Sequence, residues 1–353
     1  MKVYIALTGL LLTCTGTAAA TGLSLGAATG YNAFVFSDFT EYYTDSEGRL
    51  AVGGNFAPTG GAGFTIASLH TGDAAGVYDL VVGGNFTNTY ASMAGGDVFV
   101  GGNMTWTGPT LPHNAYVNGN FSNPAYGGST GGTIYYAGSY ASNTVLAHSQ
   151  VATPTVAPLD FLSAKTSLQS LSVSLASQVA TAAVQNNGYG TYTLTGTSFT
   201  TNVFNMTDTA YNGKTINISA PAGSTVIVNV AGTSDSFSGG SINISGVDSH
   251  SVIFNFNSAT TLGIGSIAFN GTILAPNANV TGTYGQLNGQ LIANSLAGTT
   301  ELHDVLFTGT LPTSTTNTQI AATPEPSTWF LFLAASAFCF FRRERLVALA
   351  KSR

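Results

Sequence analysis

The heptapeptide at residues 50–56, LAVGGNF, recurs as LVVGGNF at 80–86, as VFVGGNM at 98–104, as AYVNGNF at 115–121 and, degraded, as IYYAGSY at 134–140. Successive copies begin 30, 18, 17 and 19 residues apart. A period near 18 residues is too short for helical repeats, which take about 33 to 47 residues each. It fits one coil of a β-solenoid, so the body of the chain is predicted to be mainly β.

Each copy combines a short strand, a glycine pair, an asparagine and a large apolar residue. The strand alternates inward and outward side chains, and the glycines let the chain turn without steric cost. The asparagines are expected to stack from coil to coil as a ladder of amides, with the following Phe or Met in the core. A flexible Gly-rich linker is the alternative, but large apolar residues at fixed offsets favour the ordered solenoid. The longer first interval, 57–79, is expected to carry a loop insertion.

Residues 158–187 break the repeat. Apolar or small residues recur there at spacings of three and four, which places them on one stripe of a helix. We therefore predict one long helix over about 159–186, with Asp160 as its N-cap and a stop at 186–188, packed along the solenoid. Strands resume from Tyr189. The predicted stripe consists of Phe161, Ala164, Leu168, Leu171, Leu175, Val179 and Ala182.

Charge is scarce, at 7% of 353 residues, and basic charge lies almost entirely at the two ends. Between Lys2 and residue 324 the chain has only Arg49, Lys165 and Lys214 as basic residues, against all but two of its 15 acidic residues. A body with three basic residues has almost nothing to neutralise phosphates, which excludes nucleic acid as a partner and disfavours anionic membranes. Its surface must be made of neutral polar residues.

The N-terminus has the pattern of a secretory signal peptide. Lys2 is followed by an apolar run over 3–12 and by small residues that end at Ala20, after which we expect cleavage. The two cysteines, Cys14 and Cys339, lie in the end segments, so the mature body has no disulfide and no thiolate metal site.

The C-terminus combines a Pro-Glu-Pro motif, an apolar run over 330–341 and a basic cluster. This order resembles the PEP-CTERM sorting signal, which implies processing by an exosortase, passage through the inner membrane and a final place at the cell surface or in the extracellular matrix of a Gram-negative bacterium. An ordinary C-terminal membrane anchor is the alternative, since such a run also enters a bilayer as a transmembrane helix. The residues of the motif are Pro324, Glu325, Pro326, Trp329, Arg342, Arg343 and Arg345.

The predicted organisation has four parts. A signal peptide occupies 1–20, the β-solenoid 21–311, a Thr-rich linker 312–323 and the sorting signal with its membrane segment 324–353.

Two segments carry a family resemblance. Residues 31–39 lead into 45–55, and residues 270–280 are followed by 288–294. Together they resemble the choice-of-anchor A family of exported bacterial surface proteins, over roughly residues 24–311. The second segment, with a helix between two strand regions, is also similar to bacterial ice-binding proteins, which implies a right-handed β-helix with an α-helix alongside.

No residue pattern constructs a catalytic or cofactor site. The five histidines lack metal-ligand spacing. Solenoid lyases need a base, for which only Arg49, Lys165 and Lys214 are candidates, so we predict a protein that is not an enzyme and holds no cofactor. One acidic cluster could hold Ca²⁺, and a solvated turn with Arg49 as partner is the alternative. Its residues are Asp38, Glu41, Asp45 and Glu47.

These features lead to three hypotheses. The main one is a structural or adhesive protein of the surface or biofilm matrix, whose Asn- and Thr-rich face contacts exopolysaccharide or neighbouring copies. The second is an ice-binding protein, implied by the fold resemblance. The third, for which the residues offer least, is a polysaccharide-active enzyme.

Overall fold

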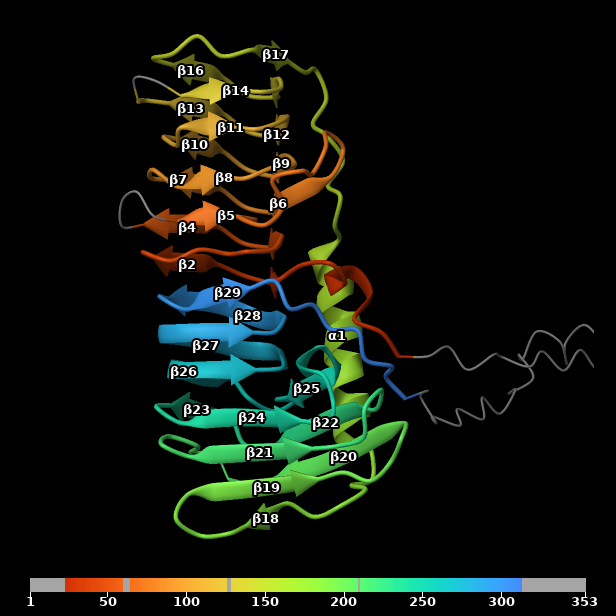
Figure 1. The fold of residues 1–353 in the computed structure, drawn as a ribbon. Helices are drawn as coiled ribbons and strands as arrows, with labels where there is room; N and C mark the ends of the chain where they lie inside the picture. Colours follow the sequence, from red (N-terminus) through yellow and green to blue (C-terminus); the bar gives the residue numbers. More distant parts are fainter. Residues whose placement is uncertain (1–22, 60–63, 126–127, 209, 313–353) are drawn as a thin grey trace, which may run out of the picture. The chain divides into compact units, whose positions relative to one another are not determined.

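The computed structural model describes residues 23–59, 64–125, 128–208 and 210–312. In this part of the chain, short parallel strands stack into a β-helix, and one α-helix runs along its side (Figure 1). The predicted fold class is therefore confirmed. Each coil contributes strands to three faces, which we call the helix face, the flat face and the third face.

The helix face is a ladder of parallel strands that lies under the α-helix. It includes the first residues of the long strands β27 (Thr272–Asn288) and β28 (Leu291–Gly298). Its other strands are β1 (Ala33–Val35), β3 (Leu50–Val52), β6 (Tyr78–Val82), β9 (Asp97–Val100), β12 (Ala115–Val117), β15 (Ile134–Tyr136), β17 (His148–Gln150), β20 (Thr201–Met206), β22 (Thr225–Val230) and β25 (Val252–Asn255).

The flat face follows the helix face along each coil. It contains the last residues of β28, the middle of β27 and the first half of β26 (Thr261–Asn270). Its other strands are β2 (Phe39–Tyr42), β4 (Phe56–Thr59), β7 (Phe86–Asn88), β10 (Met104–Trp106), β13 (Phe121–Asn123), β16 (Tyr140–Ser142) and β23 (Ser234–Ser238).

The third face closes the coil and contains the ends of β26 and β27. Two short 3-10 helices, η1 (Gly26–Ala28) and η2 (Ser249–Ser251), lie outside the three faces. The other strands of the third face are β5 (Thr65–Ile66), β8 (Ser92–Met93), β11 (Thr110–Leu111), β14 (Ser129–Thr130), β18 (Gln185–Asn186), β19 (Thr191–Thr195), β21 (Thr215–Ser219), β24 (Ser241–Ser245) and β29 (Glu301–His303).

The sequence repeat matches the register of the coils. Val52 lies opposite Val82, Val82 opposite Val100, and Val100 opposite Val117. The apolar residue after each asparagine is buried, as predicted, and Phe56 and Phe86 stack with ring centroids 5.2 Å apart.

The glycine pairs allow close approach between coils. A Cβ at Gly101 would lie 2.3 Å from the carbonyl oxygen of Gly83, and a Cβ at Gly83 would lie 2.4 Å from that of Gly53. None of these three residues has a positive φ. The pairs are therefore required by the neighbouring coil rather than by an unusual turn conformation.

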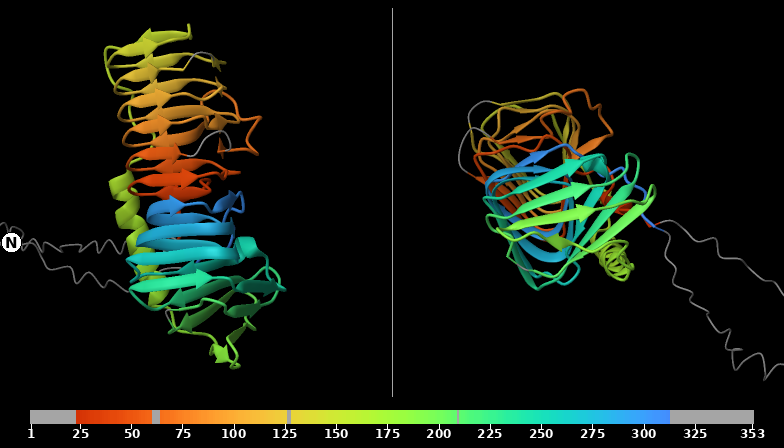
Figure 2. Two further views of the ribbon diagram at one scale, coloured as in Figure 1. Left: turned by 90° about the vertical axis from the view of Figure 1, so that its left-hand side faces the viewer. Right: turned by 60° about the horizontal axis from the view of Figure 1, so that its bottom comes forward.

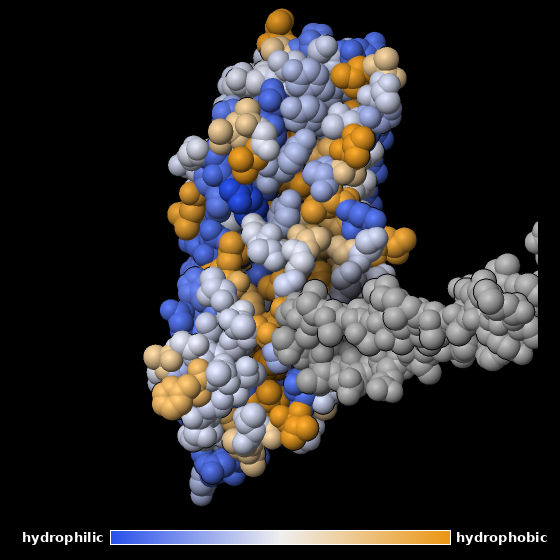
Figure 3. All heavy atoms as spheres, turned by 90° about the vertical axis from the view of Figure 1, so that its right-hand side faces the viewer, coloured by the Kyte–Doolittle hydropathy of each residue, from blue (hydrophilic) through white to orange (hydrophobic). Residues whose placement is uncertain are grey.

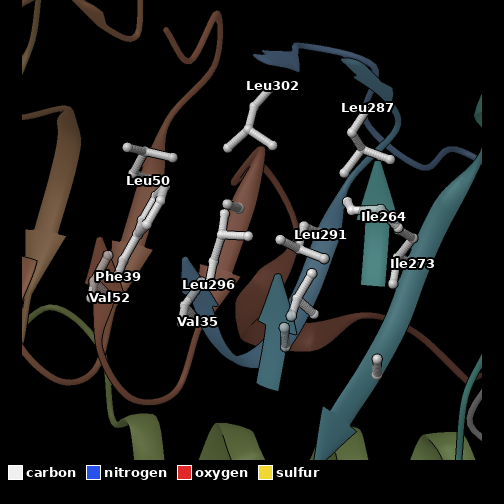
Figure 4. Packing of buried hydrophobic residues seen from close by; sticks show 14 of the residues in the cluster. Val35, Phe39, Leu50, Val52, Ile264, Ile273, Leu287, Leu291, Leu296 and Leu302 are labelled. Atoms are coloured by element: carbon white, nitrogen blue, oxygen red, sulfur yellow. The ribbon is translucent and has the colours of Figure 1, made fainter. Parts of the chain in front are cut away.

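The coils are not stacked in the order of the sequence. Strands β1 to β17 build one half of the stack and β18 to β29 the other, and the halves meet where β28 pairs with β1 and β2 (Figures 1 and 2). At this junction, Val35 and Phe39 from the first coil share the core with Leu291 and Leu296 from the last (Figure 4). The core is thus continuous through both halves.

Helix α1 (Phe161–Ala176) lies along the solenoid, as predicted, and covers the helix face from β20 to β3. The Asp160 side chain accepts hydrogen bonds from the backbone N–H groups of Leu162 and Ser163, which confirms the N-cap. Leu168 and Leu171 pack on the outward side chains of the helix face. Figure 3 looks onto this side of the molecule, where hydrophobic and hydrophilic residues are interspersed.

The predicted end of the helix was wrong. The helix stops at Ala176 instead of continuing to about residue 186, and Val179 is exposed rather than part of the buried stripe. The reason is a competing backbone contact, because the N–H of Thr181 donates to the carbonyl of Val203 at 2.9 Å. The predicted stop at 186–188 is instead the turn between β18 and β19, where the Gly188 N–H donates to Asn186.

Candidate functional site

A polar column runs along the edge of the flat face at which its strands begin. The side-chain oxygen Oδ1 of Asn55 accepts the backbone N–H of Asn85 at 3.0 Å, and the pattern continues from Asn85 to Asn103 and from Asn103 to Asn120, at 2.8 Å each. The predicted stacking of the asparagines is therefore confirmed, but the ladder is joined mainly by amide oxygens that accept backbone N–H groups of the next coil. Among the asparagines of the repeat, two side-chain amides bind each other directly only at Asn55 and Asn85. The column comprises Ser139, Asn120, Asn103, Asn85, Asn55, Asp38, Ser295, Asn279, Thr261 and Ser234.

A second column runs beside the first, two residues further along each coil. Its members point outward, because their neighbours in the sequence, such as Phe86 and Asn88 on either side of Thr87, are buried. All ten are small and uncharged. The column comprises Ala141, Ser122, Thr105, Thr87, Ala57, Thr40, Ala297, Thr281, Gly263 and Ser236.

These two columns form a continuous outward surface that crosses the junction between the halves of the stack. Adjacent strands repeat at about 4.8 Å, the ordinary spacing of a β-sheet. Asp38 is the only charged residue in either column. Helix α1 packs on the strands of the helix face, including the first residues of β27 at Leu274. Figure 2 shows the strands of the flat face one above another with α1 at the edge of the view. The face is rigid, regular and open.

The predicted calcium ligands do not come together. Asp38 belongs to the polar column and binds Asn55, whereas Glu41 points into the core and has no exposed surface. Glu47 accepts the backbone N–H of Asp304. The alternation of strand β2 separates Asp38 from Glu41, so neighbours in the sequence lie on opposite sides of the sheet. Asp45 acts on Glu41 only through its charge.

Arg49 has partners that the sequence did not indicate. Its guanidinium contacts Asp73 at 2.5 Å and Asp79 at 3.1 Å, and both acids lie in the interval 57–79, where the loop insertion was predicted. His70 joins Asp73 to Asp304 with contacts of 3.0 and 3.1 Å. The solvated turn around Arg49 is therefore corrected to an ion network that links the insertion to the last coil. The length of the first interval was the only signal for it.

The electrostatics of this network follow from burial. Burial and the Asp73 carboxylate raise the pKa of Asp79 to about 7. Although desolvation opposes it, the hydrogen bond from Arg49 lowers the pKa of Asp73. One ligand atom each of His70, Asp73 and Asp79 lies within 4.8 Å of the others, the only such group of three among the described residues. Arg49 already occupies the space between the two carboxylates with its own positive charge, so the group does not favour a metal cation.

A pocket of about 310 Å³ lies beside β18, β19 and the end of β20. The Tyr192 hydroxyl donates to the Asp208 carboxylate, and this bond together with burial raises the pKa of Tyr192 to about 12. The Tyr211 hydroxyl donates to the Asp208 carbonyl at 2.5 Å. The polar groups of Tyr192, Asp208 and Tyr211, which line the pocket, are thus hydrogen-bonded to one another.

The remaining predicted residues are placed as follows. Lys165 lies on α1 and donates to Asn294 at 2.7 Å, and Lys214 precedes β21. The sorting-signal residues Pro324, Glu325, Pro326, Trp329, Arg342, Arg343 and Arg345, together with the signal peptide, lie outside the described residues. Within the described part of the chain, no helix has the length and apolar character needed to cross a membrane.

The fold and the open face define this chain as a β-helical solenoid protein. Residues 24–111 and 105–304 match the family described as "Putative Ice-binding-like adhesive domain". Because these matches cover most of the chain, it belongs to this family of ice-binding-like adhesive domains. No curated protein matches the chain.

Three solved structures are similar to the chain at low identity. An ice binding protein from an Antarctic biological consortium is 14% identical, with a TM-score of 0.38, over 85% of this chain and 94% of that one. The ice-binding protein of the Antarctic ascomycete Antarctomyces psychrotrophicus is 16% identical, with a TM-score of 0.31, over 82% of this chain and 100% of that one. The ice binding protein of an Antarctic Flavobacteriaceae bacterium is 10% identical, with a TM-score of 0.22, over 80% of this chain and 98% of that one.

Proposed function

We propose that the chain is an ice-binding adhesive domain and that its flat face is the surface that contacts ice. The observation that carries the proposal is the column of ten small, uncharged residues beside the polar column, on a face that no helix of the described residues covers. The family to which the chain belongs is consistent with it.

The geometry suits a flat, hydroxylated crystal surface. A surface can dock over its whole area only where no side chain projects, and the small column contains nothing larger than threonine. The polar column is held in place by hydrogen bonds between coils, so its groups are ordered before contact and lose little entropy on binding. Hydroxyl and methyl groups repeated at about 4.8 Å can hold a regular layer of water between protein and ice.

The test is an ice recrystallisation assay with the purified full-length chain. We expect the chain to keep ice crystals small, and we expect Thr87→Lys combined with Thr281→Lys to require about tenfold more protein for the same effect, as when central contacts of a complementary surface are lost. Both threonines are exposed, one in each half of the stack.

The matched control is Thr195→Lys, an exposed threonine at the end of β19 on the third face. It adds the same charge away from the flat face and is expected to leave the assay unchanged. Crystals that coarsen with the wild-type chain as they do in buffer would rule out ice as the ligand. An equal loss in Thr195→Lys would remove the flat face as the site.

A second candidate function is that of a structural adhesin of the bacterial surface or matrix. It is favoured by the two end segments of the sequence. The N-terminal segment resembles a secretory signal peptide, and the tail at 324–353 resembles the PEP-CTERM sorting signal that choice-of-anchor A proteins can carry. In this function the exosortase processes the tail, and exopolysaccharide is the partner of the solenoid. In both functions the protein is exported and binds a ligand without catalysis. The pairing of Arg49 with two acids supports the second point, because it engages one of the three candidate bases.

The tail can be tested by cell fractionation. Replacing Pro324, Glu325 and Pro326 by alanine is expected to hold the chain in the inner membrane of a host that has an exosortase, because processing requires the motif. Exchange of the neighbouring Ser327 and Thr328 for alanine serves as the control. Equal release of both variants to the surface would contradict the sorting signal.

A further inference from the structure

Three exposed tyrosines lie at the corner that leads from the flat face to the third face. They are Tyr43, Tyr90 and Tyr284, with exposed fractions of 76%, 57% and 70%. All three have left-handed backbone conformations, with φ of 54°, 66° and 55°. Bulky residues rarely adopt this conformation, and persistent outliers of this kind gather at functional sites.

The three tyrosines follow the coils at a regular interval. Tyr284 belongs to the coil of β27, Tyr43 to that of β2 and Tyr90 to that of β7. One coil lies between each pair, since β28 separates β27 from β2, and β4 separates β2 from β7. Two steps of a β-ladder give a repeat of about 10 Å along the axis of the solenoid.

The corner itself does not require tyrosine. The equivalent position is Ser266 in the coil of β26 and Gly239 in that of β23, both also left-handed. Glycine adopts this conformation without steric cost. The structure therefore supports tyrosine at a position where glycine would serve the backbone better, which points to a use for the side chain.

The corner is built to hold two of these residues in place. The backbone N–H of Tyr90 donates to the hydroxyl of Thr107 at 3.0 Å, and that of Tyr284 donates to the hydroxyl of Thr299 at 2.9 Å. Each threonine belongs to the adjacent coil. The same contact recurs in both halves of the stack, so the spacing of these two rings is fixed by the solenoid.

The rings themselves are unengaged. Within the described part of the chain, none of the three contacts another aromatic ring and none of the three hydroxyls has a hydrogen-bond partner. They are regularly spaced apolar faces with a polar tip, which is the form in which tyrosine serves at interfaces.

We propose that this tyrosine row binds an extended, neutral, β-linked polysaccharide along the axis of the solenoid. The C–H groups on the flat side of a sugar ring are partly positive and pack against the electron-rich face of an aromatic ring. In an extended β-linked chain every second ring presents the same side, which agrees with tyrosines on alternate coils. Three stacked sugar rings with two rings between them would span the row.

Charge selects the neutral class of polysaccharide. Recognition of uronic acids or sulfated sugars needs cations. Arg49 is bound to Asp73 and Asp79, and Lys165 lies on α1 beside Asn294. The row is separate from the two columns of the flat face, so this proposal and ice binding can fail independently.

The test is calorimetric titration of the full-length chain with cellohexaose, chitohexaose and xylohexaose as neutral β-linked probes. We expect at least one of the three to bind, whereas polygalacturonate and the α-linked maltohexaose are expected not to bind. Each of Tyr43→Ala, Tyr90→Ala and Tyr284→Ala should weaken binding by about 2- to 10-fold, the range for one aromatic contact. The three Tyr→Phe variants should retain binding, because the ring is kept.

The matched control is Tyr189→Ala. Tyr189 is also fully exposed and left-handed, with φ of 48°, but it lies between β18 and β19, away from the row. Absence of binding to all three neutral probes would overturn the proposal, as would wild-type affinity in the triple Tyr→Ala variant. Equal weakening by Tyr189→Ala would place the ligand elsewhere.

A gain-of-function variant tests the spacing. Gly239 lies two coils below Tyr284, and a Cβ there meets no atom within 4 Å. Gly239→Tyr should extend the row by one repeat and tighten binding of a longer oligosaccharide by about 2- to 10-fold. Unchanged affinity in the folded variant would count against recognition by alternate coils.

Discussion

Replacing Glu41 by glutamine is expected to stabilise the protein at pH 8 by about 2 kcal/mol and to change its stability little at pH 4. Glu41 lies on the inner side of β2, opposite Gly298 of β28, where the two halves of the stack meet. Its side chain has no exposed surface, and neither carboxyl oxygen has a hydrogen-bond partner of good geometry among the described residues. The Thr300 backbone favours the charged form, but burial outweighs it. A buried carboxyl without partners is costly to ionise.

The sign of the pH dependence follows from the direction of the pKa shift. Burial, and then the Asp45 charge, raise the pKa of Glu41 well above its usual range in the folded state. As pH rises above the pKa that Glu41 has in the unfolded chain, Glu41 loses its proton in the unfolded state but keeps it in the folded state. The free energy of unfolding therefore falls by about 1.4 kcal/mol for each pH unit until the folded-state pKa is reached. Burial raises the pKa of Asp79 to about 7 and of Asp235 to about 6, and both act in the same direction.

Urea unfolding at pH 4, 6 and 8 measures the effect. The gain from Glu41→Gln should grow with pH, while part of the wild-type slope persists because of Asp79 and Asp235. Glu301→Gln, a half-exposed acid on β29, is the control and is expected to change stability by less than about 0.5 kcal/mol. A Glu41→Gln variant that is equally or less stable at every pH would show that the buried carboxylate is compensated.

Gly101→Ala is expected to destabilise the solenoid by about 3 kcal/mol, the upper end of the cost of overpacking. The added Cβ would lie 2.3 Å from the carbonyl oxygen of Gly83, an atom of the backbone that cannot rotate away. The N–H of Gly101 donates to Val82 at 2.8 Å, so the ladder itself must open to relieve the clash. Both neighbouring coils of the flat face would shift with it.

Thermal unfolding provides the measurement. For a domain of this size, about 3 kcal/mol corresponds to a fall in Tm of about 5 °C. Gly72→Ala is the matched control, because Gly72 has no positive φ and a Cβ there meets no atom within 4 Å. The control should stay within about 0.5 kcal/mol of the wild type. Equal Tm values for the two variants would show that contact between coils does not require glycine at 101.

Much of the candidate site follows from the sequence alone. The repeat around Asn55, Asn85 and Asn103 specified the polar column and the buried ring after each asparagine, because the side-chain alternation of a strand fixes which residues point outward. The helix start at Asp160 was equally local, since one side chain caps the first turn. The end of that helix could not be predicted locally, because the Thr181 N–H is bound by Val203 of β20, a later part of the chain.

The sequence by itself determined the solenoid, its period, the scarcity of charge and the small, neutral character of the open face. Only the tertiary structure decided the order of the coils. Strand β28 pairs with both β27 and β1 and so joins the last coil to the first. No local sequence pattern predicts a contact between strands more than 250 residues apart. That junction brings Asp304 to His70 and buries Glu41. It also sets Tyr284 two coils from Tyr43, because register across a sheet is a property of paired strands and not of either strand alone.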